Sequence, residues 1–137
     1  MIFESHAHYD DEAFDGDREA ILEQCQRDGI EYIVNVSASL STVKSTLALV
    51  ERYPFMYAAV GVHPDEVGEL NEENFAWLEE QCRNPKTVAV GEIGLDYHWD
   101  EPERDVQKKW FARQLELARE VKLPVIIHSR DAAKDTL

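Results

Sequence analysis

Two histidines stand one residue apart near the start of the chain, within the segment ESHAHYD at residues 4–10. Side chains at positions i and i+2 of an extended strand point to the same side, so both imidazoles can reach one point. Neutral imidazole is a common nitrogen ligand for divalent zinc, manganese, iron or cobalt ions. The pattern predicts that His6 and His8 bind a metal ion, the alternative being two surface histidines in a turn.

Two further residues of ligand type follow apolar runs later in the chain. Glu92 ends the run TVAVGE, and His128 ends the run PVIIH. A carboxylate in an otherwise apolar strand costs free energy unless it is paired or bound to a metal ion. Each residue alone could be a polar side chain satisfied at a strand terminus. Together with the two early histidines, they favour one shared metal site.

The segments that must position these residues alternate between strand and helix patterns. Consecutive apolar residues rich in Val and Ile are typical of parallel strands covered on both faces. Between them, apolar residues recur at helical spacing, as in Phe111, Leu115 and Ala118. The predicted strands occupy residues 1–5, 30–36, 56–62, 87–94 and 123–129.

This alternation indicates an α/β fold with right-handed crossovers. A complete eight-stranded barrel typically needs about 250 residues, whereas this chain has 137. We therefore expect residues 1–137 to form a single domain of parallel (βα) units that build about half of a TIM-type barrel, with about five strands and four to five helices. We expect this domain to be the N-terminal part of a longer, truncated barrel.

Composition narrows the class of protein. The chain carries 14 Lys and Arg against 28 Asp and Glu, a formal net charge of −14, so no overall basic surface attracts phosphates from a distance. An anionic substrate must be held locally, most simply through metal ions. Cys25 and Cys82 fall at apolar helical positions, which predicts free thiols of a reducing compartment. With no leader pattern and no long apolar run, we expect a cytoplasmic protein without membrane association.

Four blocks of the sequence, taken together, resemble the TatD family of metal-dependent hydrolases within the amidohydrolase-like barrels. They are ESHAHYD, GVHPDE at 61–66, GEIGLDY at 91–97 and PVIIHSRDA at 124–132, and they span essentially the entire chain. The resemblance implies two divalent metal ions (Mg, Mn or Zn) as cofactors. It also implies His6, His8, Glu92 and His128 as their ligands, with Glu92 bridging the two ions as the catalytic carboxylate.

The sequence departs from the family pattern in two respects. Glu4 stands where the family usually has Asp, two positions before the first histidine, and we expect this longer acid to support His6 from outside the metal site. The family also takes a further His and an Asp from later strands, and the chain ends before either. We therefore expect complete two-metal catalysis to need residues that these 137 do not supply.

Two more residues are candidates for binding the substrate. The resemblance suggests that His63, in the block GVHP, contacts a substrate phosphate or supports a metal ligand, and the alternative is a turn histidine hydrogen-bonded by its own loop. Arg130 lies two residues beyond His128 and either binds phosphate bidentately or forms a salt bridge with Asp131 or another acid. Asp96, in the loop that follows the fourth strand, is interpreted as a loop-shaping residue.

The resemblance implies hydrolysis of phosphodiester bonds in DNA by metal-activated water, in the manner of a 3′ exonuclease, with DNA or another nucleic acid as partner. The same metal site could instead cleave aminoacyl-tRNA esters. A small-molecule amide hydrolase is less favoured, because Glu92 stands where such enzymes would carry a carbamylated lysine. A different alternative is a catalytically incomplete half-barrel that self-associates, or pairs with a missing C-terminal half, through its exposed edges.

Overall fold

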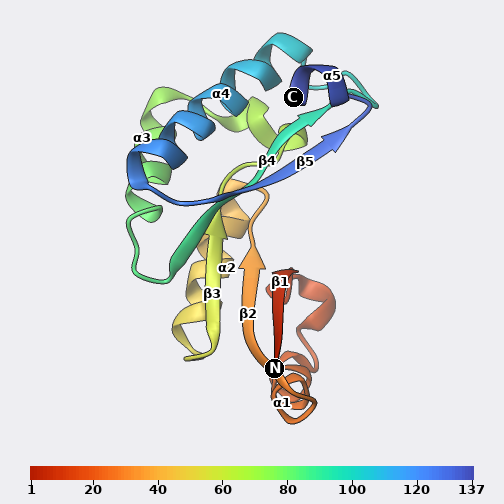
Figure 1. The fold of residues 1–137 in the computed structure, drawn as a ribbon, viewed down its shortest axis with the longest axis vertical. Helices are drawn as coiled ribbons and strands as arrows, with labels where there is room; N and C mark the ends of the chain where they lie inside the picture. The colour runs from red at the N-terminus through yellow and green to blue at the C-terminus, as the bar shows by residue number, and fades with distance from the viewer.

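The fold is built on one sheet of five parallel strands, seen in a computed structural model that describes residues 1–137 (Figure 1). The strands lie side by side in chain order, and each pairs in parallel with the next. They are β1 (Ile2–Ala7), β2 (Ile30–Val36), β3 (Met56–Val60), β4 (Thr87–Asp96) and β5 (Val125–Arg130). The sheet curls strongly, which confirms the predicted half of a TIM-type barrel.

Helices connect the successive strands, as the alternating pattern predicts. They are α1 (Arg18–Arg27), α2 (Leu40–Glu51), α3 (Glu72–Gln81) and α4 (Arg104–Val121), with a short α5 (Ala133–Thr136) after β5. Two 3-10 turns, η1 (Glu12–Phe14) and η2 (Pro64–Glu69), precede α1 and α3. Capping boxes start two of the helices, with Ser39 before α2 and Asn71 before α3 each accepting a backbone hydrogen bond.

The strand boundaries place the ligand-type residues within the strands as well as at their ends. The second strand has its predicted bounds, whereas β1 extends to Ala7 and therefore contains His6. β4 continues past residue 94, its predicted end, to Asp96. Gly94 permits this extension: its φ is +145°, and a Cβ there would lie 1.9 Å from the carbonyl oxygen of His128 in β5.

The main core lies between the helices and one face of the sheet, where Ile33, Met56 and Val60 pack with Leu22 and Leu78 in one large apolar cluster. Leu115, one of the residues whose spacing predicts helix α4, lies in that helix but is 37% exposed.

Two glutamines of α4, Gln107 and Gln114, are buried instead. The amide of Gln114 donates to the Val62 carbonyl and accepts from the Val62 N–H, at 3.2 and 2.8 Å. Gln107 does the same for Asp96 at the end of β4. Polar side chains therefore occupy the buried face of this helix where strand ends offer unpaired backbone groups.

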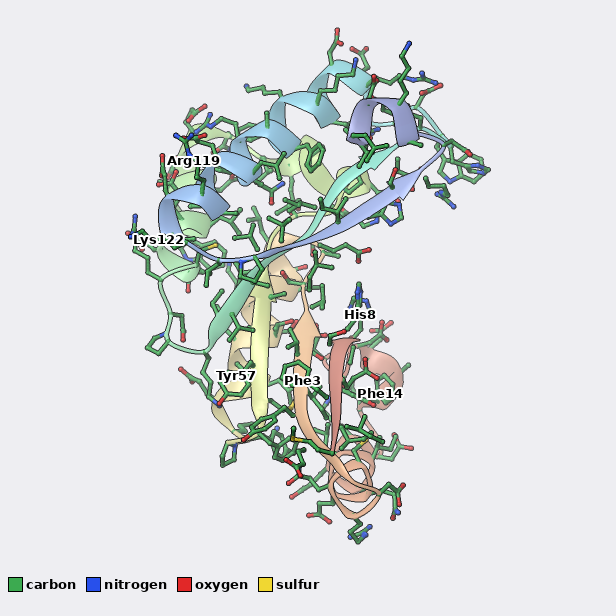
Figure 2. All side chains as sticks on the ribbon, viewed as in Figure 1. Phe3, His8, Phe14, Tyr57, Arg119 and Lys122 are labelled. Carbon is green, nitrogen blue, oxygen red and sulfur yellow. The ribbon has the colours of Figure 1, made fainter.

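The opposite, inner face of the sheet carries a smaller apolar cluster of Val34, Val36, Ala59 and Ala89. An aromatic row lies on the first three strands. Phe3 and Tyr32 have ring centroids 6.0 Å apart, and Tyr32 and Tyr57 have centroids 6.3 Å apart. Figure 2 shows Phe3 and Tyr57 on neighbouring parts of the sheet. Phe3 is 56% exposed, so part of this face is open to solvent.

The sequence predicts that Cys25 and Cys82 are free thiols, and the structure confirms this. Both thiols are free, with Cys82 buried and Cys25 half-buried. Burial raises the pKa of Cys82 to about 12, so its thiol stays protonated at neutral pH. Trp110 and Phe111 of α4 are buried in the main core. None of the helices is both long and apolar enough to cross a membrane.

Candidate metal centre

The curl of the sheet brings the four predicted ligands together. His6 lies in β1 and His128 in β5, the two outermost strands, and Glu92 lies between them in β4. The Nε2 atom of His6 is 3.5 Å from Oε2 of Glu92, and Nδ1 of His128 is 3.4 Å from Oε1. The rings of His6 and His8 have centroids 5.1 Å apart. Each oxygen of one carboxylate therefore faces an imidazole from a different edge of the sheet.

Two sets of donor atoms in this cluster suit a metal ion. In one, His6, His8 and Glu92 each offer an atom within 4.8 Å of the other two, and in the other His63, Glu92 and His128 do so. Two imidazole nitrogens with one carboxylate oxygen are ligands typical of zinc, manganese or iron. The donor set present therefore fits a divalent ion, and Glu92 belongs to both sets.

Hydrogen bonds from β2 and the segment after β1 fix the ring of His8. Its Nδ1 lies 2.8 Å from the carbonyl oxygen of Val36, which can only accept, so Nδ1 carries the proton and Nε2 keeps its lone pair. The buried Asn35 accepts from the Tyr9 N–H at 2.6 Å and donates to Asp10 at 2.9 Å. The two residues that follow His8 are thus tied to β2.

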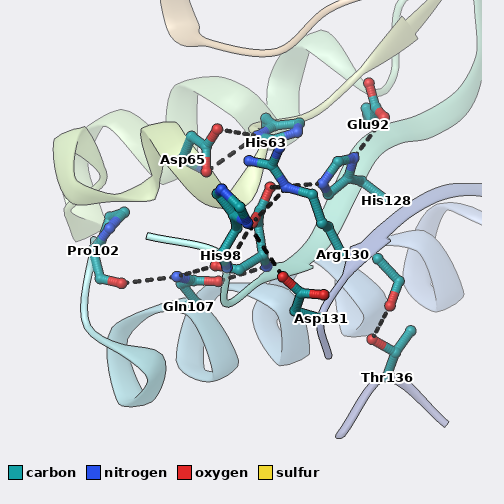
Figure 3. A network of polar contacts seen from close by, with 12 residues as sticks. His63, Asp65, Glu92, His98, Pro102, Gln107, His128, Arg130, Asp131 and Thr136 are labelled. Carbon is teal, nitrogen blue, oxygen red and sulfur yellow. Dashed lines mark hydrogen bonds and ion pairs between the residues drawn. The ribbon is translucent and has the colours of Figure 1, made fainter. Parts of the chain in front are cut away.

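Asp96, at the end of β4, organises the side of the site near β5, where Figure 3 shows His128 and Arg130 close together. Its Oδ2 lies 2.9 Å from Nε2 of His128, and it accepts from Nε of Arg130 and from the backbone N–H of His98. Burial alone would raise the pKa of Asp96, but these hydrogen bonds lower it to about 2, so the carboxylate stays ionised. It holds His128 with Nδ1 facing Glu92.

His63 combines both interpretations offered by the sequence. It begins η2, where its Nδ1 accepts from the Asp65 N–H at 3.1 Å, which is the bond expected of a turn histidine. Its ring also lies beside that of His128, with centroids 4.3 Å apart. Burial and then the neighbouring His128 lower the pKa of His63, which favours a neutral ring. Because Nδ1 accepts, the neutral ring carries its proton on Nε2.

Arg130 forms a salt bridge, but with Asp96 and not with Asp131. Its Nε donates to both carboxylate oxygens of Asp96, at 3.1 and 2.9 Å. The side chain remains 45% exposed. Asp131 instead pairs with the exposed His98, at 3.3 Å from Nδ1. Arg130 is therefore oriented by a buried acid while its outer part stays accessible at the rim of the site.

Glu4 and Ser37 support the site through the backbone. Glu4 accepts from the N–H of His6 at 3.1 Å, so it contacts the backbone of this residue and not its imidazole. Ser37, which is fully buried, donates from Oγ to the carbonyls of Ala59 and Gly61, and its own carbonyl accepts from the N–H of Glu92 at 3.0 Å. The ends of β2, β3 and β4 are thereby joined around Glu92.

Sequence patterns alone do not reveal the parts played by Asp96, Asn35 and Ser37. Ser37 follows β2 directly, and the other two are polar residues within strands, a combination that signals burial with a specific partner. The partners, however, come from strands and loops that are distant in sequence. An acid where the fourth strand meets the loop that follows it, as Asp96 is, would have been the only usable signal.

Comparisons with known proteins agree with this geometry. The sequence profile of the family described as TatD related DNase matches residues 3–137. The chain belongs to the TatD-related DNase family. It is 43% identical over all 137 residues to a Bacillus subtilis protein named "Uncharacterized metal-dependent hydrolase YabD". It is 33% identical over 119 residues, 87% of this chain, to the "3'-5' ssDNA/RNA exonuclease TatD" of Cronobacter turicensis.

A solved structure of this family has the same fold. The crystal structure of the TatD homologue YjjV from Escherichia coli superposes with a TM-score of 0.89 at 35% identity, covering 98% of this chain and 53% of that one. The chain covers 54% of YabD and 45% of the Cronobacter exonuclease. It therefore spans about half the length of the TatD relatives that it matches.

Proposed function

We propose that the protein is a TatD-type metal-dependent hydrolase that cleaves phosphodiester bonds in nucleic acid from a 3′ end. The observation that carries the proposal is the position of Glu92, with one carboxylate oxygen 3.5 Å from His6 and the other 3.4 Å from His128. The family membership and the exonuclease name of a relative that is 33% identical support it. The activity of the whole protein is part of this proposal.

The hydrogen bonds of the four histidines indicate which of them can bind a metal ion and which one can donate a hydrogen bond to the substrate. His8 and His128 each engage one nitrogen with an oxygen acceptor, Val36 or Asp96, which leaves the other nitrogen free to bind a metal ion. His6 has no competing partner besides Glu92. His63 uses Nδ1 as an acceptor, so its Nε2–H suits donation to a substrate oxygen better than metal binding. The ligands that we propose are His6, His8, Glu92 and His128.

The two oxygens of Glu92 face different histidines, so this residue could contribute one ligand to each of two ions, with His6 and His8 holding one ion and His128 the other. When bound, such ions supply Lewis acidity, which lowers the pKa of water and offsets negative charge on an ester oxygen. Asp96 keeps His128 in the ligating tautomer and orients Arg130. We propose that the exposed part of Arg130, together with His63, holds the phosphate of the substrate.

The proposal is tested by incubating the purified full-length protein with single-stranded DNA and Mg²⁺ or Mn²⁺. We expect nucleotide release from the 3′ end, and we expect the His6→Ala variant to lose at least about 100-fold in rate, because a ligand to the ion is removed. The nuclease function would be refuted if wild-type protein bound Mn²⁺ but left the DNA intact, as the His6→Ala variant does. Cleavage of an aminoacyl-tRNA ester without cleavage of DNA would favour the carbonyl substrate.

The exposed inner face supports a second candidate role, in self-association. Phe3 on β1 and Tyr32 on β2 are 56% and 40% exposed, which is unusual for large side chains whose rings lie next to one another. β1 is also an edge strand, with unpaired backbone groups on one side. We propose that a second copy of the chain covers this surface.

Analytical ultracentrifugation checks this role. We expect wild-type chain to dimerise at micromolar concentration and the Phe3→Ser variant to need about ten-fold more protein, since an aromatic contact at the centre of an interface is lost. Leu115→Ser, which removes an exposed leucine from α4 on the other side of the sheet, is the matched control and should not shift the equilibrium. A strictly monomeric wild-type chain would rule out the association.

A further inference from the structure

Beside the candidate metal centre, the loop after β4 presents an exposed tryptophan that the proposed chemistry does not use. Trp99 is 71% exposed, more than any other aromatic side chain of the protein. The other two tryptophans lie on helices, with Trp110 buried and Trp77 half-buried against the main core. An exposed indole presents a large π face, so Trp99 is available to contact a ligand.

The orientation of this indole is fixed relative to the metal centre by a continuous series of contacts. The rings of His98 and Trp99 meet edge to face, with centroids 4.5 Å apart and an interplanar angle of 89°. The N–H of His98 donates to Asp96 at 3.1 Å, and its Nδ1 lies 3.3 Å from Asp131. Asp96 is the same carboxylate that holds His128 and Arg130. Figure 3 shows His98, Arg130 and Asp131 together on one side of this network.

The charges around Trp99 indicate what kind of group it contacts. Three exposed acids follow it in residues 100–104, namely Asp100, Glu101 and Glu103. The one cation in these residues is Arg104, which is paired with Asp100 at 2.6 Å. A phosphate would be repelled there, whereas a neutral planar ring would not. Stacking of a base on an aromatic side chain depends little on the sequence of the nucleic acid, because every base has a π face.

We infer that Trp99, held edge-on by His98, is a stacking platform for a nucleobase of a single-stranded substrate. The inference rests on the proposed nuclease function and adds to it a binding site for the base. Arg130 and His63 would hold the phosphate, and Trp99 would hold the base next to it. The platform makes the protein prefer chains whose bases are unpaired and free to stack, since a base within a duplex is already stacked on its neighbours.

The test compares two single-stranded probes of equal length and charge, an oligothymidylate and a base-free tetrahydrofuran phosphate chain. Both carry phosphorothioate linkages to slow cleavage, and binding with Mn²⁺ is followed by fluorescence anisotropy. We expect wild-type protein to bind the oligothymidylate about ten-fold more tightly. Trp99→Ala should reduce this ratio to about two-fold or less, whereas Trp99→Phe should keep most of it because an aromatic face remains.

The matched control is Trp77→Phe, which changes a tryptophan on α3, and it should keep the wild-type ratio. Equal binding of the two probes by wild-type protein, binding of neither, or an unchanged ratio in Trp99→Ala would each overturn the inference. Hydrolysis is scored separately with unmodified oligothymidylate and Mn²⁺. Binding with the expected base preference but without hydrolysis would refute the nuclease function and leave the platform in place.

Discussion

Replacing Glu92 with glutamine is expected to lower the affinity of the protein for Mn²⁺ by at least about 100-fold. Loss of a hydrogen-bond partner behind a metal ligand already costs 10–100-fold in affinity, and Glu92 is proposed to bind the ions directly. It lies within 3.5 Å of both His6 and His128, so both donor sets lose their only carboxylate. Glutamine keeps the shape of the side chain but offers a neutral oxygen, a much weaker ligand for a divalent ion.

Isothermal titration calorimetry with MnCl₂ measures this affinity, and the circular dichroism spectrum shows whether the variant is folded. Glu66→Gln, which removes the same charge from the exposed residue in η2, is the control and should bind Mn²⁺ within about two-fold of wild type, as expected for an exposed charge. A folded Glu92→Gln variant that binds Mn²⁺ as tightly as the control would contradict the proposed metal centre.

The second large effect is expected at Asp96, where asparagine should lower both the free energy of unfolding and the affinity for Mn²⁺. The side chain of Asp96 is 1% exposed and accepts hydrogen bonds from Arg130, His98 and His128. Asparagine removes the charge and places an NH₂ donor against at least one of these donors. We expect a loss of about 2–3 kcal/mol in unfolding free energy, below the 3–5 kcal/mol of a fully buried pair because Arg130 is partly solvated.

The affinity of the Asp96→Asn variant for Mn²⁺ should fall by about 10–100-fold, because His128 is no longer held in its ligating tautomer. Urea unfolding of metal-free protein measures the stability, and calorimetry measures the affinity. Asp131→Asn is the matched control, since Asp131 is 64% exposed and its φ of 53° suits asparagine. The control should lose less than about 1 kcal/mol. Equal losses in the two variants would show that Asp96 has no special role.

The order of strands and helices follows from local patterns. Val-rich and Ile-rich runs such as residues 30–36 are apolar at successive positions because both faces of a parallel strand are covered, and this signal does not depend on distant residues. Helix α4 illustrates where such patterns fail. Leu115 has helical spacing but is exposed, whereas Gln107 and Gln114 are buried by hydrogen bonds to β4 and to Val62. Apolar spacing carries no information about which backbone groups need partners.

The sequence by itself determined that His6, His8, Glu92 and His128 lie in parallel strands or directly after them. The HxH spacing and the apolar runs before the other two place such side chains near one end of a sheet. The tertiary structure decided how they meet. Curling of the sheet brings β1 and β5 to the two oxygens of Glu92. The hydrogen bonds of His8 with Val36, of His128 with Asp96 and of His63 with Asp65 then select which nitrogen of each ring is free. A tautomer depends on partners that only folding brings within hydrogen-bonding distance, so no local pattern can encode it.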